Sequence, residues 1–307
     1  MKYKELVKLW YDEHKKTIKE SSASSYSVII YSYLIPKFGD FKRNKIKHSD
    51  IQNYIFELSE KGLSNKTIKK IIIVLTSSLK YSLNGNDVND INFSFSYPKC
   101  NNINNVEIFS AREKNKLANY LVSNIDKKYC LGILIALMSG IRIGELCALK
   151  WSDIDFSNGI LHINKTLQRV YEKTGDGGYS KIDISIPKSK SSIRDIPISK
   201  DLLKMLKDSK EKREMFILTG NLHYMEPRLL RSHYDSILKK LKITHKKFHS
   251  LRHTFASSAI QLGIDYKTVS EILGHSNVNT TLQIYVHSKM SQKRKCMELI
   301  TKNIIMN

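Results

Sequence analysis

The sequence has too few cysteines, too widely spaced, for a zinc site or a disulfide framework. The four are Cys100, Cys130, Cys147 and Cys296, and no CxxC pair occurs. Unpaired thiols are typical of a reducing compartment, so we expect a cytoplasmic protein. The sequence also lacks a phosphate loop of the GxxxxGKS or GxxxxGKT type and a convincing cluster of acidic metal ligands. We therefore expect chemistry without a nucleotide energy source, a metal ion or another cofactor.

Long apolar segments are missing as well. The most apolar stretch, 127–140, is shorter than the roughly 20 residues that span a bilayer, and it predicts a buried core helix. The N-terminus, "MKYKELVKLWYDEHKK", alternates charged and apolar residues and has no signal-peptide run. We therefore predict no membrane partner.

Acidic residues are scarce relative to basic ones. Lys plus Arg number 51 against 29 Asp plus Glu, which gives a formal net charge of +22. A charge of this size favours a polyanionic partner, with nucleic acid as the leading candidate and an anionic membrane surface as the alternative. The basic residues are spread along the whole chain, which suits a protein that wraps its partner.

Two domains are predicted from the distribution of turn-forming residues. Residues 84–105 are dense in Asn, Asp and Ser and are interpreted as an interdomain linker. Residues 1–83 are expected to form a small all-α domain, and residues 106–307 a larger domain. Four helices are expected in the first domain. They lie at about 3–18, at about 22–35, from a cap at Ser49 or Asp50 to Gly62, and from Ser64 onward.

The second domain is predicted to be mixed, which makes the protein α+β. Ser110 and Glu113 have capping-box spacing, and the apolar helix 128–139 should end at Gly140. Alternating residues in 159–171 and 181–199 predict a small antiparallel sheet, with 181–199 as a hairpin around a polar turn. The rest is expected to be mainly helical.

Arg142 lies in a Gly-flanked turn at the predicted start of a helix. A guanidinium beside the unpaired N–H groups of a helix N-terminus favours a phosphate ligand. The alternative is an ordinary surface ion pair with Glu145, and this stretch alone does not decide between them.

Three histidines, at positions 245, 249 and 253, recur at helical spacing and could bind a metal. Arg252 and several lysines would repel a divalent cation there, and no acidic or thiol ligand is near. We favour pairing His249 with Arg252, one turn apart, as a proton-exchanging group beside a bidentate anion ligand. An isolated HxxR also arises by chance in a basic chain.

Two groups of lysines are further candidates. Lys188 and Lys190 lie in the turn "PKSKSS", where a lysine can enter a DNA groove or supply a proton, although turns are polar in any case. Three more lysines lie in the first turns of the fourth helix, where phosphate contacts and a solvated face are about equally favoured: Lys66, Lys69 and Lys70.

His275 and Tyr285 complete a possible metal-free site for a phosphodiester, although Tyr285 could also be simply half-buried. Two guanidinium groups can stabilise the transition state, and a tyrosine oxygen can attack phosphorus to form a phosphotyrosine. A lysine or histidine can then protonate the departing 5′ oxygen.

Three segments resemble the successive active-site blocks of the tyrosine recombinases. They are "LMSGIRIGELCALKWSDID" (137–155), "HSLRHTFAS" (249–257) and "LGHSNVNTTLQIYVH" (273–287). Their order and spacing resemble the phage and conjugative-transposon integrase branch, as does the turn "PKSKSSIRDIPIS" (187–199). The four N-terminal helices resemble that branch's core-site-binding domain, so the resemblance covers nearly the whole chain.

The resemblance implies a role for each candidate residue. Arg142 and Arg252 would be the catalytic arginines, and His249 would open the HxxR block. His275 would hydrogen-bond to the scissile phosphate, and Tyr285 would be the nucleophile.

Lys188 would be the catalytic lysine, with Lys190 as the alternative because the turn varies in length among such proteins. Glu145 and His253 would orient the arginines.

The resemblance implies a site-specific recombinase that cleaves double-stranded DNA through a 3′-phosphotyrosyl bond and acts as a homotetramer to integrate or excise a mobile element. Participation of an excision factor is left open. Many integrases of this branch carry an arm-site-binding domain ahead of the core-binding helices, and whether this protein has lost such a domain is left open. The tail after Tyr285 could pack on its own subunit or on a neighbouring one. The alternatives are a type IB topoisomerase and a non-catalytic DNA-binding protein.

Overall fold

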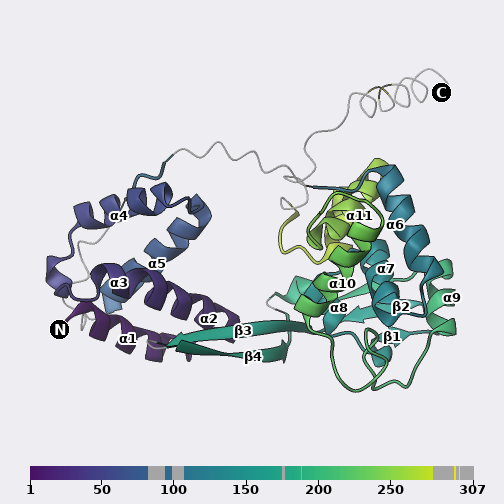
Figure 1. Ribbon diagram of the computed structural model, residues 1–307, viewed down its shortest axis with the longest axis horizontal. Coiled ribbons are helices and arrows are strands. Elements are labelled where there is room, and N and C mark those ends of the chain that lie inside the picture. The colour runs from purple at the N-terminus through teal and green to yellow at the C-terminus, as the bar shows by residue number, and fades with distance from the viewer. Residues whose placement is uncertain are drawn as a thin grey trace. The chain divides into compact units, whose positions relative to one another are not determined.

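The chain forms two compact units in a computed structural model (Figure 1). The structure describes residues 1–81, 94–98, 107–174, 177–187, 189–278, 294 and 297. One unit comprises Met1–Asn104 with Arg169–Ile182, and the other comprises Asn105–Gln168 with Asp183–Asn307. The chain therefore passes from one unit to the other three times. The domain boundaries expected from the sequence stay a prediction, because nearly all of 84–105 lies outside the described residues.

The first unit is a helical bundle around a single apolar core. Its helices are α1 (Tyr3–His14), α2 (Glu20–Ile29), the π-helical turn η1 (Ile30–Leu34), α3 (Ile35–Phe38), the 3-10 turn η2 (Arg43–Lys45), α4 (His48–Glu60) and α5 (Asn65–Tyr81). The apolar positions predicted to face the core of α5 are buried, because they recur every three to four residues on one side of the helix: Ile68, Ile71, Ile72, Leu75 and Leu79.

Two details of this bundle differ from the sequence prediction. The second helix is divided, because the π-helical turn η1 separates α2 from α3. Helix α4 begins at His48, ahead of both predicted caps, and the Asp50 carboxylate accepts a hydrogen bond from the Lys47 amide at 2.9 Å. Gly62 ends this helix as predicted, with φ +79°.

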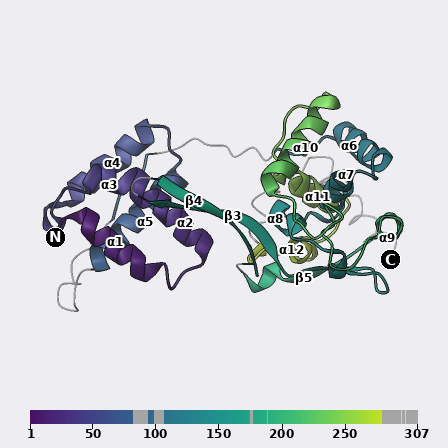
Figure 2. The ribbon, with the colours of Figure 1, turned by 60° about the horizontal axis from the view of Figure 1, so that its bottom comes forward.

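A long β-hairpin, β3 (Thr166–Thr174) with β4 (Gly177–Ser185), packs through its outer part with the first unit (Figures 1 and 2). Ser24 and Ser27 of α2 anchor it: Ser24 exchanges hydrogen bonds with the Tyr171 backbone, and the Lys173 amide donates to Ser27 Oγ at 2.9 Å. The predicted hairpin within 181–199 is therefore wrong. Strand β4 pairs with β3 instead, and β5 (Arg194–Pro197) pairs with β2 (Ile160–Ile163).

The second unit packs helices around a three-stranded antiparallel sheet of order β1-β2-β5. The strands are β1 (Ile154–Asp155), β2 (Ile160–Ile163) and β5 (Arg194–Pro197), with the 3-10 turns η4 (Trp151–Asp153) and η5 (Lys190–Ser192). The helices are α6 (Ala111–Ser123), α7 (Lys128–Ser139), α8 (Ile143–Cys147), α9 (Lys200–Asp208), α10 (Pro227–Lys240), α11 (His249–Gln261) and α12 (Tyr266–Leu273). The α+β class predicted from the sequence is confirmed.

Helix α7 is the centre of the second unit, as its composition predicts. Nearly every residue from Cys130 to Ser139 is buried, and the helix ends at Gly140 in a left-handed conformation with φ +67°. A Cβ at Gly140 would lie 2.7 Å from Leu273 and 2.8 Å from Phe255, so the close packing of α7, α11 and α12 requires glycine here. The capping box of Ser110 and Glu113 at α6 is confirmed. Helices α7, α11 and α12 thus meet where the candidate site begins.

Candidate active site

Arg142 is the N-cap residue of the short helix α8, directly after the turn that ends α7. Its backbone amide donates to Glu145 Oε2 at 2.9 Å, and its Nη1 donates to Glu145 Oε1 at 2.7 Å. Glu145 is 2% exposed, whereas the Arg142 side chain is 36% exposed. The ion pair considered as the alternative does form, but only its carboxylate is buried. The guanidinium therefore remains open to a ligand while Glu145 holds it.

Helix α11 brings His249 and Arg252 to the same place. His249 is its first residue, and Arg252, one turn later, is 3% exposed. Arg252 Nη1 donates to the Gly140 carbonyl at 2.9 Å, which ties α11 to the turn before Arg142. The His253 ring lies edge-to-face against the His249 ring, with centroids 4.6 Å apart.

His275 enters from the third segment. It follows Gly274, which ends α12 in a left-handed conformation with φ +66°. Arg142 Nη2 donates to the Gly274 carbonyl at 3.1 Å, so the turn that carries His275 is bonded directly to the first arginine. Arg142, Arg252, His249 and His275, expected together from their sequence blocks, do converge.

The electrostatics of the histidines reflect this convergence. Partial desolvation, with the charges of His253, Arg252 and Arg142, lowers the pKa of His249 to about 4. Desolvation, with the charges of Arg252 and Arg142, lowers the pKa of His275 to about 4. Both imidazoles are therefore neutral at pH 7, and each can accept a proton on one nitrogen while donating a hydrogen bond from the other.

Glu145 stays ionised although it is buried. Burial acts to raise the pKa of its carboxyl, but the hydrogen bonds from Arg194 and the charges of Arg194 and Arg142 outweigh burial and lower that pKa. A buried carboxylate between two arginines keeps them at a fixed separation. It also leaves a local excess of positive charge, since one carboxylate faces Arg142, Arg194 and the nearby Arg252. Such an excess suits a phosphodiester anion.

Arg194 is a residue of this site that the sequence reasoning missed. It opens β5 and binds Glu145 through both terminal nitrogens, at 3.1 and 3.0 Å. The two residues are 49 positions apart in the sequence, and no local spacing joins them. The available signal was its place in segment 187–199, which resembles the integrase branch, but that resemblance directed attention to the lysines of the segment and not to Arg194.

Two predicted catalytic residues, Lys188 and Tyr285, lie outside the described residues. Lys190 begins η5, and nothing is described of its side chain. Strands β4 and β5, which flank Lys190 in the sequence, belong to two different sheets, so Lys190 does not lie at the tip of a hairpin between them. The three lysines near the start of α5 are exposed, and Lys69 Nζ lies 5.1 Å from the centre of the Tyr97 ring.

A basic cleft of about 410 Å³ opens beside His249. Its walls include Arg231, His245 and Lys247, with the apolar residues that flank Arg142. His245 Nε2 lies 3.4 Å from the carboxylate of Asp235, the one acidic residue of the lining. Within the described residues, no group of three or more His, Cys, Asp or Glu side chains is arranged to hold a metal ion.

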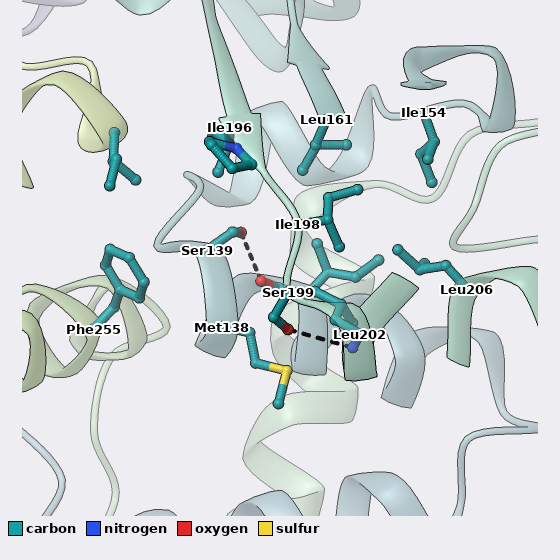
Figure 3. A pocket seen from close by; sticks show the side chains of 13 residues that line it. Met138, Ser139, Ile154, Leu161, Ile196, Ile198, Ser199, Leu202, Leu206 and Phe255 are labelled. Carbon is teal, nitrogen blue, oxygen red and sulfur yellow. Dashed lines mark hydrogen bonds between the residues drawn. The ribbon is translucent and has the colours of Figure 1, made fainter. Parts of the chain in front are cut away.

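A second cavity, of about 140 Å³, is apolar and offers no such chemistry (Figure 3). Its two hydroxyl groups are already bonded: Ser139 Oγ donates to the Ile135 carbonyl at 2.6 Å, and Ser199 Oγ accepts from the Leu202 amide at 3.4 Å. The other labelled side chains are aliphatic, aromatic or thioether groups that point into the space (Figure 3). This cavity is not a phosphate site.

Comparison with known families decides the class of the protein. The model of the Phage integrase family matches residues 107–292, more than half of the chain, and the model of the phage integrase N-terminal SAM-like domain matches residues 2–59. The chain belongs to the phage integrase family. It is a tyrosine recombinase, an enzyme that cleaves and rejoins DNA without ATP, and this prediction from the sequence is confirmed.

Individual relatives agree with this assignment. A tyrosine recombinase XerC-like protein of Caldanaerobacter subterraneus subsp. tengcongensis is 31% identical over 281 residues, covering 83% of this chain and 71% of that protein. The ICEBs1 integrase of Bacillus subtilis is 28% identical over 262 residues, covering 79% of this chain and 67% of that protein. The structure of the Tn1549 transposon integrase with transposon right-end DNA matches in fold with a TM-score of 0.77 at 23% identity, covering 98% of this chain and 100% of that one.

Among the described helices of this family member, none combines the length and the apolar composition needed to cross a bilayer.

Proposed function

We propose that this recombinase acts on double-stranded DNA at the ends of a mobile element, with Tyr285 as the nucleophile. The observation that carries the proposal is the convergence of Arg142, Arg252, His249 and His275 from three chain segments onto one basic site. That donor set matches a single phosphodiester: two guanidinium groups for the non-bridging oxygens and two neutral imidazoles for proton exchange.

The charges of the two arginines and the neutral state of the two histidines suggest how the DNA strand is cleaved. The bound phosphate lies against Arg142 and Arg252, which stabilise the charge that develops on phosphorus-bound oxygens in the transition state. Neutral His249 accepts the phenolic proton of Tyr285, and the phenolate oxygen forms a bond to phosphorus as the bond to the 5′ oxygen breaks. Lys188 gives a proton to the departing 5′ oxygen, and His275 hydrogen-bonds to a non-bridging oxygen.

The phosphotyrosyl bond conserves the energy of the broken phosphodiester. A 5′ hydroxyl from a partner duplex can therefore reverse the attack and join the strands without ATP. Strand exchange between two duplexes needs four cleavage sites, so four subunits act together on DNA. The several relatives named as integrases or transposases of mobile elements favour an element of that kind. We place the reaction in the cytoplasm, and an excision factor is a candidate partner.

A nicked duplex tests this mechanism, because the short 5′ fragment diffuses away after cleavage and traps the covalent protein–DNA adduct. The substrate is a duplex carrying the junction of the element, nicked a few nucleotides from the cut. We expect an adduct with the wild type and none with Tyr285→Phe. Tyr266→Phe is the matched control: Tyr266 is 37% exposed on α12, nine residues before His275, and its loss should leave the adduct in place.

Three other outcomes have distinct meanings. Tight DNA binding without an adduct in the wild type indicates a non-catalytic DNA-binding protein. An adduct together with relaxation of a single supercoiled plasmid, without any recombinant product from two sites, indicates a topoisomerase. An adduct that persists in Tyr285→Phe rules out this tyrosine as the nucleophile.

A further inference from the structure

Arg194 is a buried arginine whose three guanidinium nitrogens all donate within the protein. Its side chain is 6% exposed. Nη2 and Nη1 donate to the two Glu145 oxygens at 3.0 and 3.1 Å, Nη1 also donates to the Ser192 carbonyl at 3.0 Å, and Nε donates to the Ile272 carbonyl at 2.5 Å. A guanidinium engaged in this way has little capacity left for a phosphate. Arg194 therefore differs in kind from Arg142, which is partly open to solvent.

The partners of Arg194 belong to three chain segments that carry catalytic candidates. Glu145 holds Arg142 through that residue's amide and Nη1. Ile272 lies in the last turn of α12, three residues before His275. Ser192 closes η5, the turn that begins at Lys190. The Arg194 side chain is thus hydrogen-bonded to α8, which follows Arg142, to the end of α12, which precedes His275, and to η5, which begins at Lys190.

The end of α12 is fitted closely to this arginine. A Cβ at Gly274 would lie 2.9 Å from Arg194 Cδ and 2.7 Å from the Ser191 carbonyl, and the residue has φ +66°, so only glycine fits well. Arg194 and Arg142 each bond a carbonyl of this turn, at Ile272 and Gly274. Cations at a helix C-terminus are favoured by its unpaired carbonyls and by the helix dipole.

We propose that Arg194 is a positioning residue for DNA cleavage: through Glu145 and the α12 turn it holds Arg142 and His275 at the separation that one phosphate requires. Arg194 itself does not contact DNA. The inference rests on the roles proposed above for Arg142 and His275. It adds a residue that acts on both of them at once and that lies in neither of their sequence blocks.

Arg142 needs such positioning because its side chain is partly exposed and can move. Its side chain is 36% exposed, and Glu145 is the group that fixes its Nη1. Without Arg194, Glu145 can move with Arg142, and the α12 turn loses its bond at Ile272. A displacement of about 1 Å in a positioned group is enough to reduce a rate by about 100-fold. Lysine at 194 keeps the charge, but one ammonium cannot reach both carboxylate oxygens and the Ile272 carbonyl in the same geometry.

The test compares two nicked suicide duplexes that differ only at the scissile phosphate. One carries the ordinary phosphodiester, and the other carries a methylphosphonate, in which a methyl group replaces one charged oxygen. A group that acts on the negative charge of the phosphate matters for the first substrate and much less for the second. The rate of covalent adduct formation is measured at saturating protein for wild type, Arg142→Ala, Arg194→Met, Arg194→Lys and the double variant of Arg142→Ala with Arg194→Met.

We expect Arg142→Ala to slow the phosphodiester reaction by roughly 100-fold or more and the methylphosphonate reaction far less. Arg194→Met should give the same pattern with a loss on the order of 10- to 100-fold, and Arg194→Lys a smaller one. The double variant should be about as slow as Arg142→Ala alone, because both changes remove the same interaction.

Lys165→Met is the matched control, since it breaks another partly buried ion pair of the same unit, with Asp153 at 2.9 Å. It should change thermal stability without a substrate-selective loss of rate. Near-UV circular dichroism reports folding, and Arg194→Lys, which retains the buried charge, serves as the decisive variant if Arg194→Met does not fold.

The inference is overturned if the folded Arg194 variants slow both substrates equally, or if the double variant is slower by the product of the single losses. Failure of the proposed function looks different, because the wild type itself then forms no adduct on the phosphodiester.

Discussion

Replacing Glu145 by glutamine perturbs the centre of the site with almost no change in shape. The carboxylate is 2% exposed and accepts four hydrogen bonds, two from Arg142 and two from Arg194. Glutamine retains one acceptor oxygen, but its NH₂ group faces guanidinium donors, and the Arg194 charge, 6% exposed, is left without a counterion.

The expected loss of stability is large. Removing one partner of a buried ion pair costs about 3–5 kcal/mol, because an uncompensated charge stays buried. A domain of about 150–250 residues, the size class of the second unit, loses roughly 2–4 °C of melting temperature per kcal/mol. We therefore expect Glu145→Gln to melt on the order of 10 °C below wild type by differential scanning calorimetry.

Glu113→Gln is the matched control. Glu113 pairs with Lys246 at 2.7 Å, but its side chain is 26% exposed, so its loss should cost only about 1 kcal/mol or less. Replacing Glu145 and Arg194 together by methionine removes both charges and should recover most of the stability lost in Glu145→Gln, without recovering DNA cleavage. The reasoning is refuted if Glu145→Gln melts no lower than Glu113→Gln.

Three further predictions concern the ionisation of Glu145, the packing of Gly144 and the net charge of the chain. The Arg194 and Arg142 charges hold the folded-state pKa of Glu145 below its ordinary value of 4.5, so between these two pKa values the unfolded chain binds more protons than the folded protein. The stability that this group contributes should therefore be present above pH 4.5 and lost as the pH falls through the folded pKa. Urea titrations from about pH 6 to about pH 3 should show a smaller loss of stability in acid for Glu145→Gln than for wild type. Gly144→Ala places a Cβ 2.7 Å from the Leu167 carbonyl and from Thr166 Oγ1, so we expect a loss of about 1–3 kcal/mol in denaturant unfolding together with slower cleavage, and an unchanged midpoint would contradict this packing. Affinity for duplex DNA should fall with salt with a log–log slope of several units, since each neutralised phosphate releases about one counterion, and a flat response in a filter-binding series would contradict a basic wrapping surface.

The helical parts of the fold could be predicted because their signals are local. The apolar spacing in α5, the capping box at Ser110 and the glycine that ends α7 each act within a few residues, and all three appear as expected. The strand pairing was not predictable in the same way. Alternation in 181–199 shows that both halves are extended, but it does not say which strand each half joins, and β5 pairs with β2 across more than 30 residues.

The residues of the candidate site show the same difference between local and long-range signals. Arg142, Arg252, His249 and His275 were identified because each lies in a block with its own sequence pattern. Arg194 depends on Glu145, 49 residues away, and on a carbonyl of α12, 78 residues away. Such contacts exist only in the folded chain, so no spacing in the sequence indicates them.

The central claim is that one phenol oxygen forms the covalent bond to DNA, and peptide mapping of the trapped adduct tests it most directly. The adduct formed on the nicked duplex is digested with trypsin and nuclease, and the peptide that carries the residual nucleotide is fragmented by mass spectrometry. The account predicts that the nucleotide is attached to Tyr285. Attachment to any of the other 15 tyrosines of the chain, or to a serine or histidine, would contradict it.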